Sequence, residues 1–202
     1  VPENEKKYSE LMSLGYQKLN QNSFDEAEKT FISAYKVFGN REAPLEAVDV
    51  VKNAKLNHLI TELDNKASRE KRNENWQKVF EYYSDILKID SSLTRAKKEK
   101  AFSEGRIQLE KKLAAVLHEP SRLFNGKNLA AAQTLLDRAK KERVIGPKLS
   151  KKISNLEEFI ILSSKQKKLI ISSDNLTDVR LGKDRSLGFF KERIVKLKPG
   201  RY

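Results

Sequence analysis

The strongest constraint on the fold is a pattern of side chains that occurs three times at nearly equal intervals. Each copy places four residues at relative positions 0, 3, 7 and 10, and the first residues of the copies lie 52 and 53 positions apart. Steps of three and four residues bring all four side chains onto one face of an α-helix. The regular interval favours a helical repeat, and three unrelated amphipathic helices are the alternative. The copies are Phe24, Ala27, Phe31 and Ala34; Trp76, Val79, Tyr83 and Ile86; and Leu129, Ala132, Leu136 and Ala139.

The segment around the first copy resembles the tetratricopeptide repeat, a helical hairpin motif. In LMSLGYQKLNQNSF, Leu11 and Gly15 match the first helix of that motif, and DEAEKTFISA matches its second helix. The resemblance implies that Gly15 lets the two helices approach closely. The second copy, NWQKVFEYYSDILKIDSS, is similar to the family, with Ala67 in place of the glycine. The third resembles it less, because Pro120 falls where the small residue would be and predicts an irregular hairpin. The resemblance covers residues 8–140.

The interval of about 52 residues is longer than the 34 residues of a tetratricopeptide repeat. The additional residues fall in two segments, 43–73 and 92–119, and each is predicted to form one long helix. Pro44 suits a first helical position. Such long helices need packing partners from the next repeat, from the C-terminal segment or from another molecule. An apolar stripe of helical spacing runs along the first segment and consists of Leu45, Val48, Leu56, Leu59, Leu63 and Ala67.

The C-terminal residues change to short runs that are typical of β-strands. Strands are expected at Leu169–Ser172, Asp178–Leu181 and Arg193–Leu197, and they would form a β-meander that docks on the helix predicted at residues 148–164. Through LIISSD, VRLG, IVKL and LKPGRY, this segment resembles the small PEGA-type surface module, in which Pro199 and Gly200 would form the turn before a last strand.

The sequence therefore predicts a mainly α fold. We expect a tetratricopeptide-like stack of long antiparallel helical hairpins in residues 1–164, followed by a small β-module in residues 165–202. Because the chain stops at Tyr202, before a last strand could be completed, we expect that the module is truncated.

Residues that would carry catalysis or bind a metal do not form a recognisable pattern. His58 and His118 lack a neighbouring ligand pattern, and the chain contains no cysteine. The segment GKDRS has a glycine and a lysine but not the spacing of a phosphate-binding loop. We therefore expect no catalytic residues, no metal and no cofactor, and a protein that is not an enzyme.

Positive charge is the second feature that bears on function. The net charge is +13, and residues 138–168 hold ten Lys and Arg against three Asp and Glu. A basic face of this size suits nucleic acid, anionic phospholipid or an acidic protein. The sequence contains no recognition-helix or RNA-binding motif, which disfavours specific nucleic-acid binding. The candidate basic patch consists of Arg138, Lys140, Lys141, Arg143, Lys148, Lys151 and Lys152.

Two function classes follow from these features. In the first, the protein is a non-enzymatic interaction scaffold that binds a peptide or a partner domain in a groove between helical hairpins. In the second, the basic C-terminal half binds an anionic lipid surface or nucleic acid. Association with further copies of the chain is also open. The candidate groove residues are Met12, Tyr16, Leu19 and Asn20 in the first hairpin and Asp64, Lys71 and Arg72 in the second, and Met12, Tyr16 and Leu19 are expected to be exposed.

The location is predicted from the C-terminal resemblance. The sequence has no apolar run long enough to span a bilayer and no recognisable signal peptide. The PEGA-type resemblance implies the periplasmic or extracytoplasmic face of a bacterial inner membrane. An anchor would then precede Val1, since the sequence begins without an initiator Met. The cytoplasm is the alternative.

Overall fold

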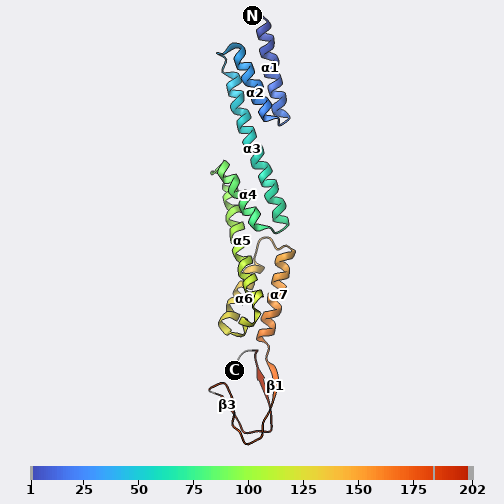
Figure 1. The fold of residues 1–202 in the computed structure, drawn as a ribbon, viewed down its shortest axis with the longest axis vertical. Coiled ribbons are helices and arrows are strands. Elements are labelled where there is room, and N and C mark those ends of the chain that lie inside the picture. The colour runs from blue at the N-terminus through green and yellow to red at the C-terminus, as the bar shows by residue number, and fades with distance from the viewer. Residues whose placement is uncertain (1, 184, 200–202) are drawn as a thin grey trace. The chain divides into compact units, whose positions relative to one another are not determined.

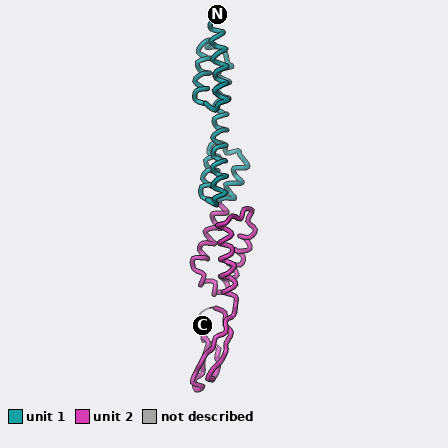
Figure 2. The backbone as a smooth tube through the Cα atoms, turned by 90° about the vertical axis from the view of Figure 1, so that its right-hand side faces the viewer, with its two compact units in different colours: residues 1–103 teal, residues 104–202 magenta. Residues whose placement is uncertain are grey.

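The structure is a computed structural model that describes residues 2–183 and 185–199. The described residues are mainly helical, and their strands all lie near the C-terminus (Figure 1). This confirms the predicted fold class of mainly α with a small C-terminal β-meander. The chain divides into two compact units, residues 1–103 and 104–202, which Figure 2 shows in different colours.

Helices α1 (Pro2–Asn20) and α2 (Phe24–Phe38) pack as a hairpin that is closest at a glycine. Gly15 of α1 is buried, and a Cβ atom at this position would lie 2.5 Å from Cε1 of Phe31. A side chain at position 15 would therefore have to displace the Phe31 ring, which is itself buried. The predicted role of Gly15 in a close helix contact is confirmed.

Helix α3 (Ala43–Arg72) packs its first turns against this hairpin. Pro44 lies in its first turn, as predicted, since proline needs no backbone N–H there. The first core of the chain contains Ala27, Phe31, Ala47, Val48 and Val51, drawn from α2 and α3.

Helix α4 (Trp76–Ile89) packs against the last part of α3, and α5 (Thr94–His118) follows it in the chain. The Trp76 ring meets the edge of the Phe102 ring of α5 at a centroid distance of 5.5 Å. Together, α3 and α5 account for the two long helices that the sequence predicts at residues 43–73 and 92–119.

The repeated pattern identifies the buried face of three helices. All four residues of the second copy are buried, and so are the last three residues of the first and third copies. The first residues, Phe24 and Leu129, are half-buried. Phe24 and Trp76 each begin a helix, whereas Leu129 is the fourth residue of α6 (Gly126–Lys140).

The apolar stripe predicted along α3 is buried only in part. Val48 and Ala67 are buried, but Leu45, Leu56 and Leu59 are exposed. The stripe is therefore not covered along its whole length by the described residues. Helices α2 and α4 pack on different parts of the 30-residue helix, and Leu56 and Leu59 are left exposed between them.

The second unit contains the last part of α5, the short 3₁₀ helix η1 (Pro120–Phe124), α6 and α7 (Pro147–Ser164). Its helices share a core that includes Leu109, Leu113, Leu136, Leu149 and Leu156. Pro120 begins η1, which confirms the irregular hairpin predicted at this residue.

A buried arginine joins α5 to the connection between α6 and α7. The side chain of Arg106 is completely buried; its Nη1 donates a hydrogen bond of 2.6 Å to the Val144 carbonyl, and its Nε donates one of 3.1 Å to Glu110. Glu142 lies 4.0 Å away, and Glu110 also pairs with Lys152 of α7. Two carboxylates and a backbone carbonyl therefore compensate the buried positive charge of Arg106.

The C-terminal strands form two antiparallel pairs, one nested between the members of the other. Strands β1 (Lys167–Ser172) and β4 (Glu192–Leu197) pair with each other. Strands β2 (Val179–Leu181) and β3 (Arg185–Gly188) form the inner hairpin. Strand β3 was not expected from the sequence.

The β-module has a small core of its own. Leu187, Phe190, Val195 and Leu197 are buried in this core, and Ile171 packs against it. The members of this cluster all come from the strand segment, and docking of the module on α7 stays a prediction. The predicted turn at Gly200 and the end at Tyr202 lie outside the described residues.

Candidate functional site

The groove predicted in the first hairpin is partly filled by the chain itself. Met12 and Leu19 are half-buried and pack against the first core, so the expectation that they stand exposed is wrong. The reason is that α3 lies beside the hairpin and contributes residues to the same core. Tyr16 is exposed over about half of its surface and meets Phe31 edge-on, with ring centroids 4.9 Å apart. Asn20 is exposed.

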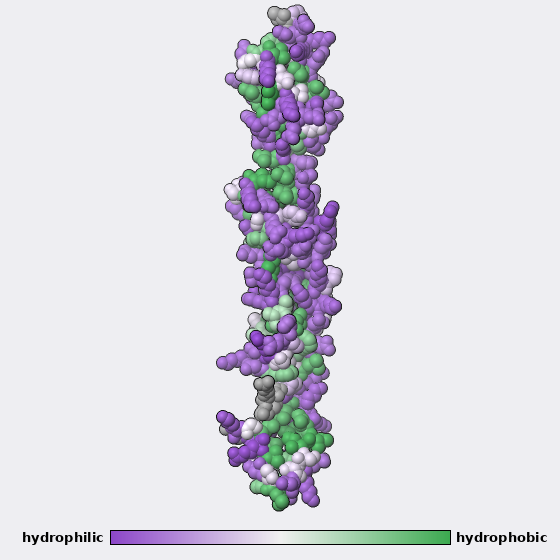
Figure 3. Space-filling model, in the orientation of Figure 1, coloured by the Kyte–Doolittle hydropathy of each residue, from purple (hydrophilic) through white to green (hydrophobic). Residues whose placement is uncertain are grey.

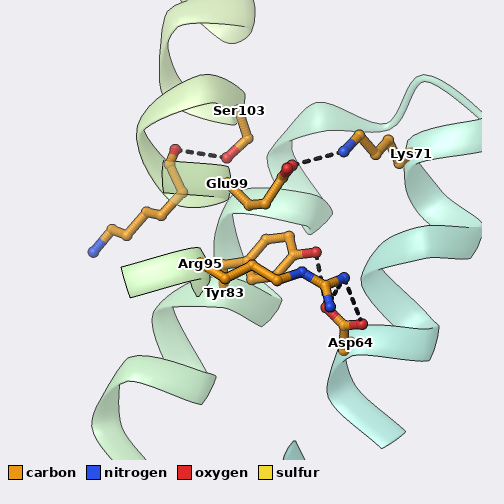
Figure 4. A network of polar contacts seen from close by, with 7 residues as sticks. Asp64, Lys71, Tyr83, Arg95, Glu99 and Ser103 are labelled. Atoms are coloured by element: carbon orange, nitrogen blue, oxygen red, sulfur yellow. Dashed lines mark hydrogen bonds and ion pairs between the residues drawn. The ribbon is translucent and has the colours of Figure 1, made fainter. Parts of the chain in front are cut away.

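Two of the three candidates in the second hairpin belong to a polar network between α3, α4 and α5 (Figure 4). The Asp64 carboxylate accepts hydrogen bonds from the Tyr83 hydroxyl at 2.9 Å and from Arg95 Nη2 at 3.0 Å. Lys71 Nζ lies 2.6 Å from the Glu99 carboxylate. These contacts hold three helices together, which is a structural role. Arg72, the last residue of α3, is exposed.

The network also perturbs the acidity of a phenol. Burial raises the pKa of Tyr83 to about 12, and the hydrogen bond to the Asp64 carboxylate acts in the same direction. A neutral hydroxyl that donates to a carboxylate is therefore the stable form at neutral pH.

The predicted basic patch extends over α6, the connection after it and α7. Lys140 pairs with Glu157, and Lys152 pairs with Glu110, so part of the patch is neutralised within the unit. The remaining five members of the patch have exposed side chains, namely Arg138, Lys141, Arg143, Lys148 and Lys151. Arg138 also lines a pocket that the sequence did not predict.

This pocket lies between α5, η1 and α6 and has a volume of about 560 Å³. We call it the α5–α6 groove. One side consists of Lys112, Ala115 and Val116 of α5 together with Glu119, the residue after this helix. The other side is a face of α6 with residues at relative positions 0, 3, 4, 7 and 10, namely Asn128, Ala131, Ala132, Leu135 and Arg138.

Small side chains make the groove hollow. Ala115 and Ala131 are exposed on the two facing helices, and Leu123 of η1 is buried below them. An alanine carries only a methyl group, so these helices leave room where longer side chains would fill the space. The floor is consequently apolar.

The two ends of the groove differ in charge. Of the lining residues, Lys112 and Arg138 are the farthest along the chain from η1, which places them toward the end away from the turn. At the turn end, Arg122 pairs with Glu119 at 2.7 Å, and Asn128 Nδ2 donates a hydrogen bond of 3.0 Å to the Arg122 carbonyl. The end formed by Lys112 and Arg138 is basic and suits an anionic group.

The charge of the chain is concentrated in the second unit. Residues 104–202 hold 23 Lys and Arg against 11 Asp and Glu, a net charge of +12 out of the total of +13. The first unit is nearly neutral. Figure 3 shows one face of the molecule, which is mainly hydrophilic, with apolar areas among the hydrophilic residues. An anionic partner would therefore be attracted to the second unit.

Among the described residues, no group of three or more His, Cys, Asp or Glu side chains is placed to hold a metal ion. None of the helices in that same part combines the length and the apolar character that crossing a bilayer requires. Comparison of the chain with protein-family models, with curated proteins and with solved structures gives no match.

Proposed function

We propose that this protein is a non-enzymatic interaction scaffold that binds an acidic segment of a partner protein in the α5–α6 groove. The observation that carries the proposal is the chemistry of the groove, an apolar floor of small side chains with a basic end formed by Lys112 and Arg138. The resemblance of the N-terminal helices to tetratricopeptide repeats supports a scaffold role by analogy. It does not define the partner.

The dimensions of the groove suit a short peptide segment. The lining face of α6 extends from Asn128 to Arg138, ten residue steps that correspond to about 15 Å of helix axis. About four or five residues of an extended chain cover that length at roughly 3.3 Å each. A segment that pairs an aliphatic side chain with a carboxylate would place the first on the alanines and the second near Arg138.

Electrostatics supports an acidic partner over a neutral one. The net charge of +12 on the second unit attracts anionic molecules over distances of about a Debye length, which is ~8 Å at physiological ionic strength. Attraction of this kind raises the association rate, whereas the apolar floor contributes affinity that salt weakens less. We therefore expect binding that is reduced, but not abolished, by added salt.

Selection of peptides from a random displayed library against the full chain tests the proposal without a known partner. We expect enrichment of peptides in which Asp or Glu lies close to an aliphatic residue. The affinity of a selected peptide, measured by fluorescence anisotropy, should fall about tenfold or more in Ala131→Trp, because the indole fills the groove. Ala131 is exposed, so this change does not disturb the core.

Ala114→Trp is the matched control, since Ala114 is exposed on α5 and does not line the groove. A selected peptide that binds wild type, Ala131→Trp and Ala114→Trp equally would overturn the proposal. The charge contribution is tested by Lys112→Gln with Arg138→Gln against Lys111→Gln with Lys141→Gln, which remove the same charge outside the groove.

The envelope location stays a prediction. If the protein is a scaffold at the extracytoplasmic face of a bacterial membrane, its partner would be an envelope protein. The proposed groove binding does not depend on that location.

A further inference from the structure

The outer face of the β1–β4 pair carries an arrangement that the groove does not use. Alternate residues of a strand point to opposite faces, so Lys168, Ile170, Lys196 and Ile194 lie on the same face. The register places Ile170 directly opposite Ile194, and Lys168 directly opposite Lys196. We call this four-residue surface the Ile–Lys face.

The two isoleucines are exposed to an unusual degree for apolar side chains. Ile170 is 63% exposed and Ile194 is 60% exposed, while Val195 and Leu197 on the opposite side of the same strand are buried in the module core. The module thus has an inner face that supplies its core, although Leu169 on that face is 47% exposed, and an outer face on which an aliphatic pair meets solvent.

The two lysines conflict with a purely structural role for this face. Like charges directly opposite each other in a β-ladder are destabilising. Lys168 and Lys196 are both exposed, and the face offers a carboxylate only at its far end, at Glu192 opposite Ser172. An anionic ligand at the lysine end would relieve this repulsion, and the adjoining isoleucines would rest against its apolar part.

Further apolar side chains lie in the two connections that leave the outer strand pair at Ser172 and Glu192, the end away from the two lysines. Leu176, between β1 and β2, is 81% exposed, and Phe189, between β3 and β4, is 64% exposed. The Ser173 N–H donates a hydrogen bond of 2.9 Å to the Lys191 carbonyl, which holds the two connections together. The β-module therefore presents apolar side chains both on the Ile–Lys face and next to it, within a segment that is rich in lysine and arginine.

We propose that the Ile–Lys face is a docking surface for a membrane that contains anionic phospholipid. The lysine ammonium groups would meet the phosphates, and the aliphatic side chains would enter the boundary between the headgroups and the acyl chains. Nucleic acid fits less well, because single strands are bound largely by stacking of successive bases on aromatic rings; the Ile–Lys face itself has no ring, and Phe189 beside it is a single one. A lipid surface accommodates both the charge and the aliphatic groups.

Co-sedimentation of the full chain with vesicles tests this proposal. The two vesicle types are phosphatidylcholine alone and equal parts of phosphatidylcholine and phosphatidylglycerol. We expect binding to the anionic vesicles only. Lys168→Gln with Lys196→Gln should reduce the partition coefficient about 20- to 30-fold, since each lysine near an anionic surface contributes roughly fivefold.

The apolar contribution is tested by Ile170→Thr with Ile194→Thr. Threonine keeps the branched Cβ that suits a strand, so the module should remain folded while the apolar surface is lost. We expect the partition coefficient to fall about tenfold. Circular dichroism should show that the variant keeps its folded structure.

Matched controls separate a local face from diffuse charge. Lys127→Gln with Lys141→Gln removes two exposed lysines from α6 and the residue after it, and Ile145→Thr with Ile161→Thr removes two isoleucines of comparable exposure. Both controls should bind as the wild type does. Equal losses in controls and test variants, or no binding to anionic vesicles, would overturn the proposal. So would binding of a single-stranded oligonucleotide that the test variants abolish while vesicle binding is unchanged.

Discussion

Gly15→Ala should destabilise the first unit even though alanine is the better helix former. Relative to glycine, alanine in a helix interior contributes about 1 kcal/mol of stability. Against this gain, the new methyl group would lie 2.5 Å from Cε1 of Phe31, whose side chain is fully buried and cannot move outward. Overpacking of this kind costs about 1–3 kcal/mol. We expect a net loss of about 1 kcal/mol in the free energy of unfolding.

Gly105→Ala is the matched control within the same chain. Gly105 is also helical, but no atom lies within 4 Å of a Cβ built at this position. The substitution should therefore increase stability by about 0.5–1 kcal/mol. Unfolding by urea, followed by far-ultraviolet circular dichroism, measures both variants, and the expected signs are opposite.

A double-mutant cycle isolates the contact itself. In a Phe31→Leu background the ring is absent, so Gly15→Ala should there become neutral or stabilising, with a coupling energy of about 1 kcal/mol or more. If Gly15→Ala is as stable as the wild type in the presence of Phe31, α1 and α2 do not approach as closely as the structure places them.

Three further changes test the packing and the polar network. Ala27→Leu should cost about 1–3 kcal/mol in a urea melt, because Ala27 is completely buried, and an unchanged midpoint would contradict that burial. Arg106→Ala should cost about 3–5 kcal/mol by the same measurement, since it removes the buried guanidinium that donates to the Val144 carbonyl and pairs with Glu110; a loss below 1 kcal/mol would refute the buried network. The pKa of Tyr83, about 12 in the folded protein, lies above the ordinary value of 10, so the stability it contributes is full below pH 10 and is lost as the pH rises toward 12. In an ultraviolet titration, one tyrosine should ionise at a pH of about 12, and Tyr83→Phe should remove this transition.

The sequence predicts the helices well, because their signal is periodic and local. The pattern beginning at Trp76 marks a face that is buried throughout, and Gly15 identifies the position where two helices meet. Pro44 and Pro120 mark a helix start and an irregular turn. Each of these predictions depends on residues that are close together in the sequence.

The candidate site is predicted less well, because it depends on which helix faces are left uncovered. Periodicity places Met12 and Leu19 on a helix face, but their burial requires the position of α3. The spacing of Ala131 with Asn128 and Leu135 could have pointed to a second face of α6. The residues near it in the sequence, however, do not show that this face borders a groove. Strand β3 was missed because its four residues include glycine and serine, which favour turns.

The order of contacts along the chain has a consequence for how the protein emerges from the ribosome. In the N-terminal unit, α1 packs on α2, α2 on α3, and α3 on α4, so each helix finds its partner among residues made immediately before or after it. Folding of this part can advance with synthesis, since contacts that are local in sequence form quickly. Strand β1 must instead wait for β4, because Lys167 pairs with Leu197. During that interval the aliphatic side chains of β1 have no strand partner, and they are open to contact with a chaperone.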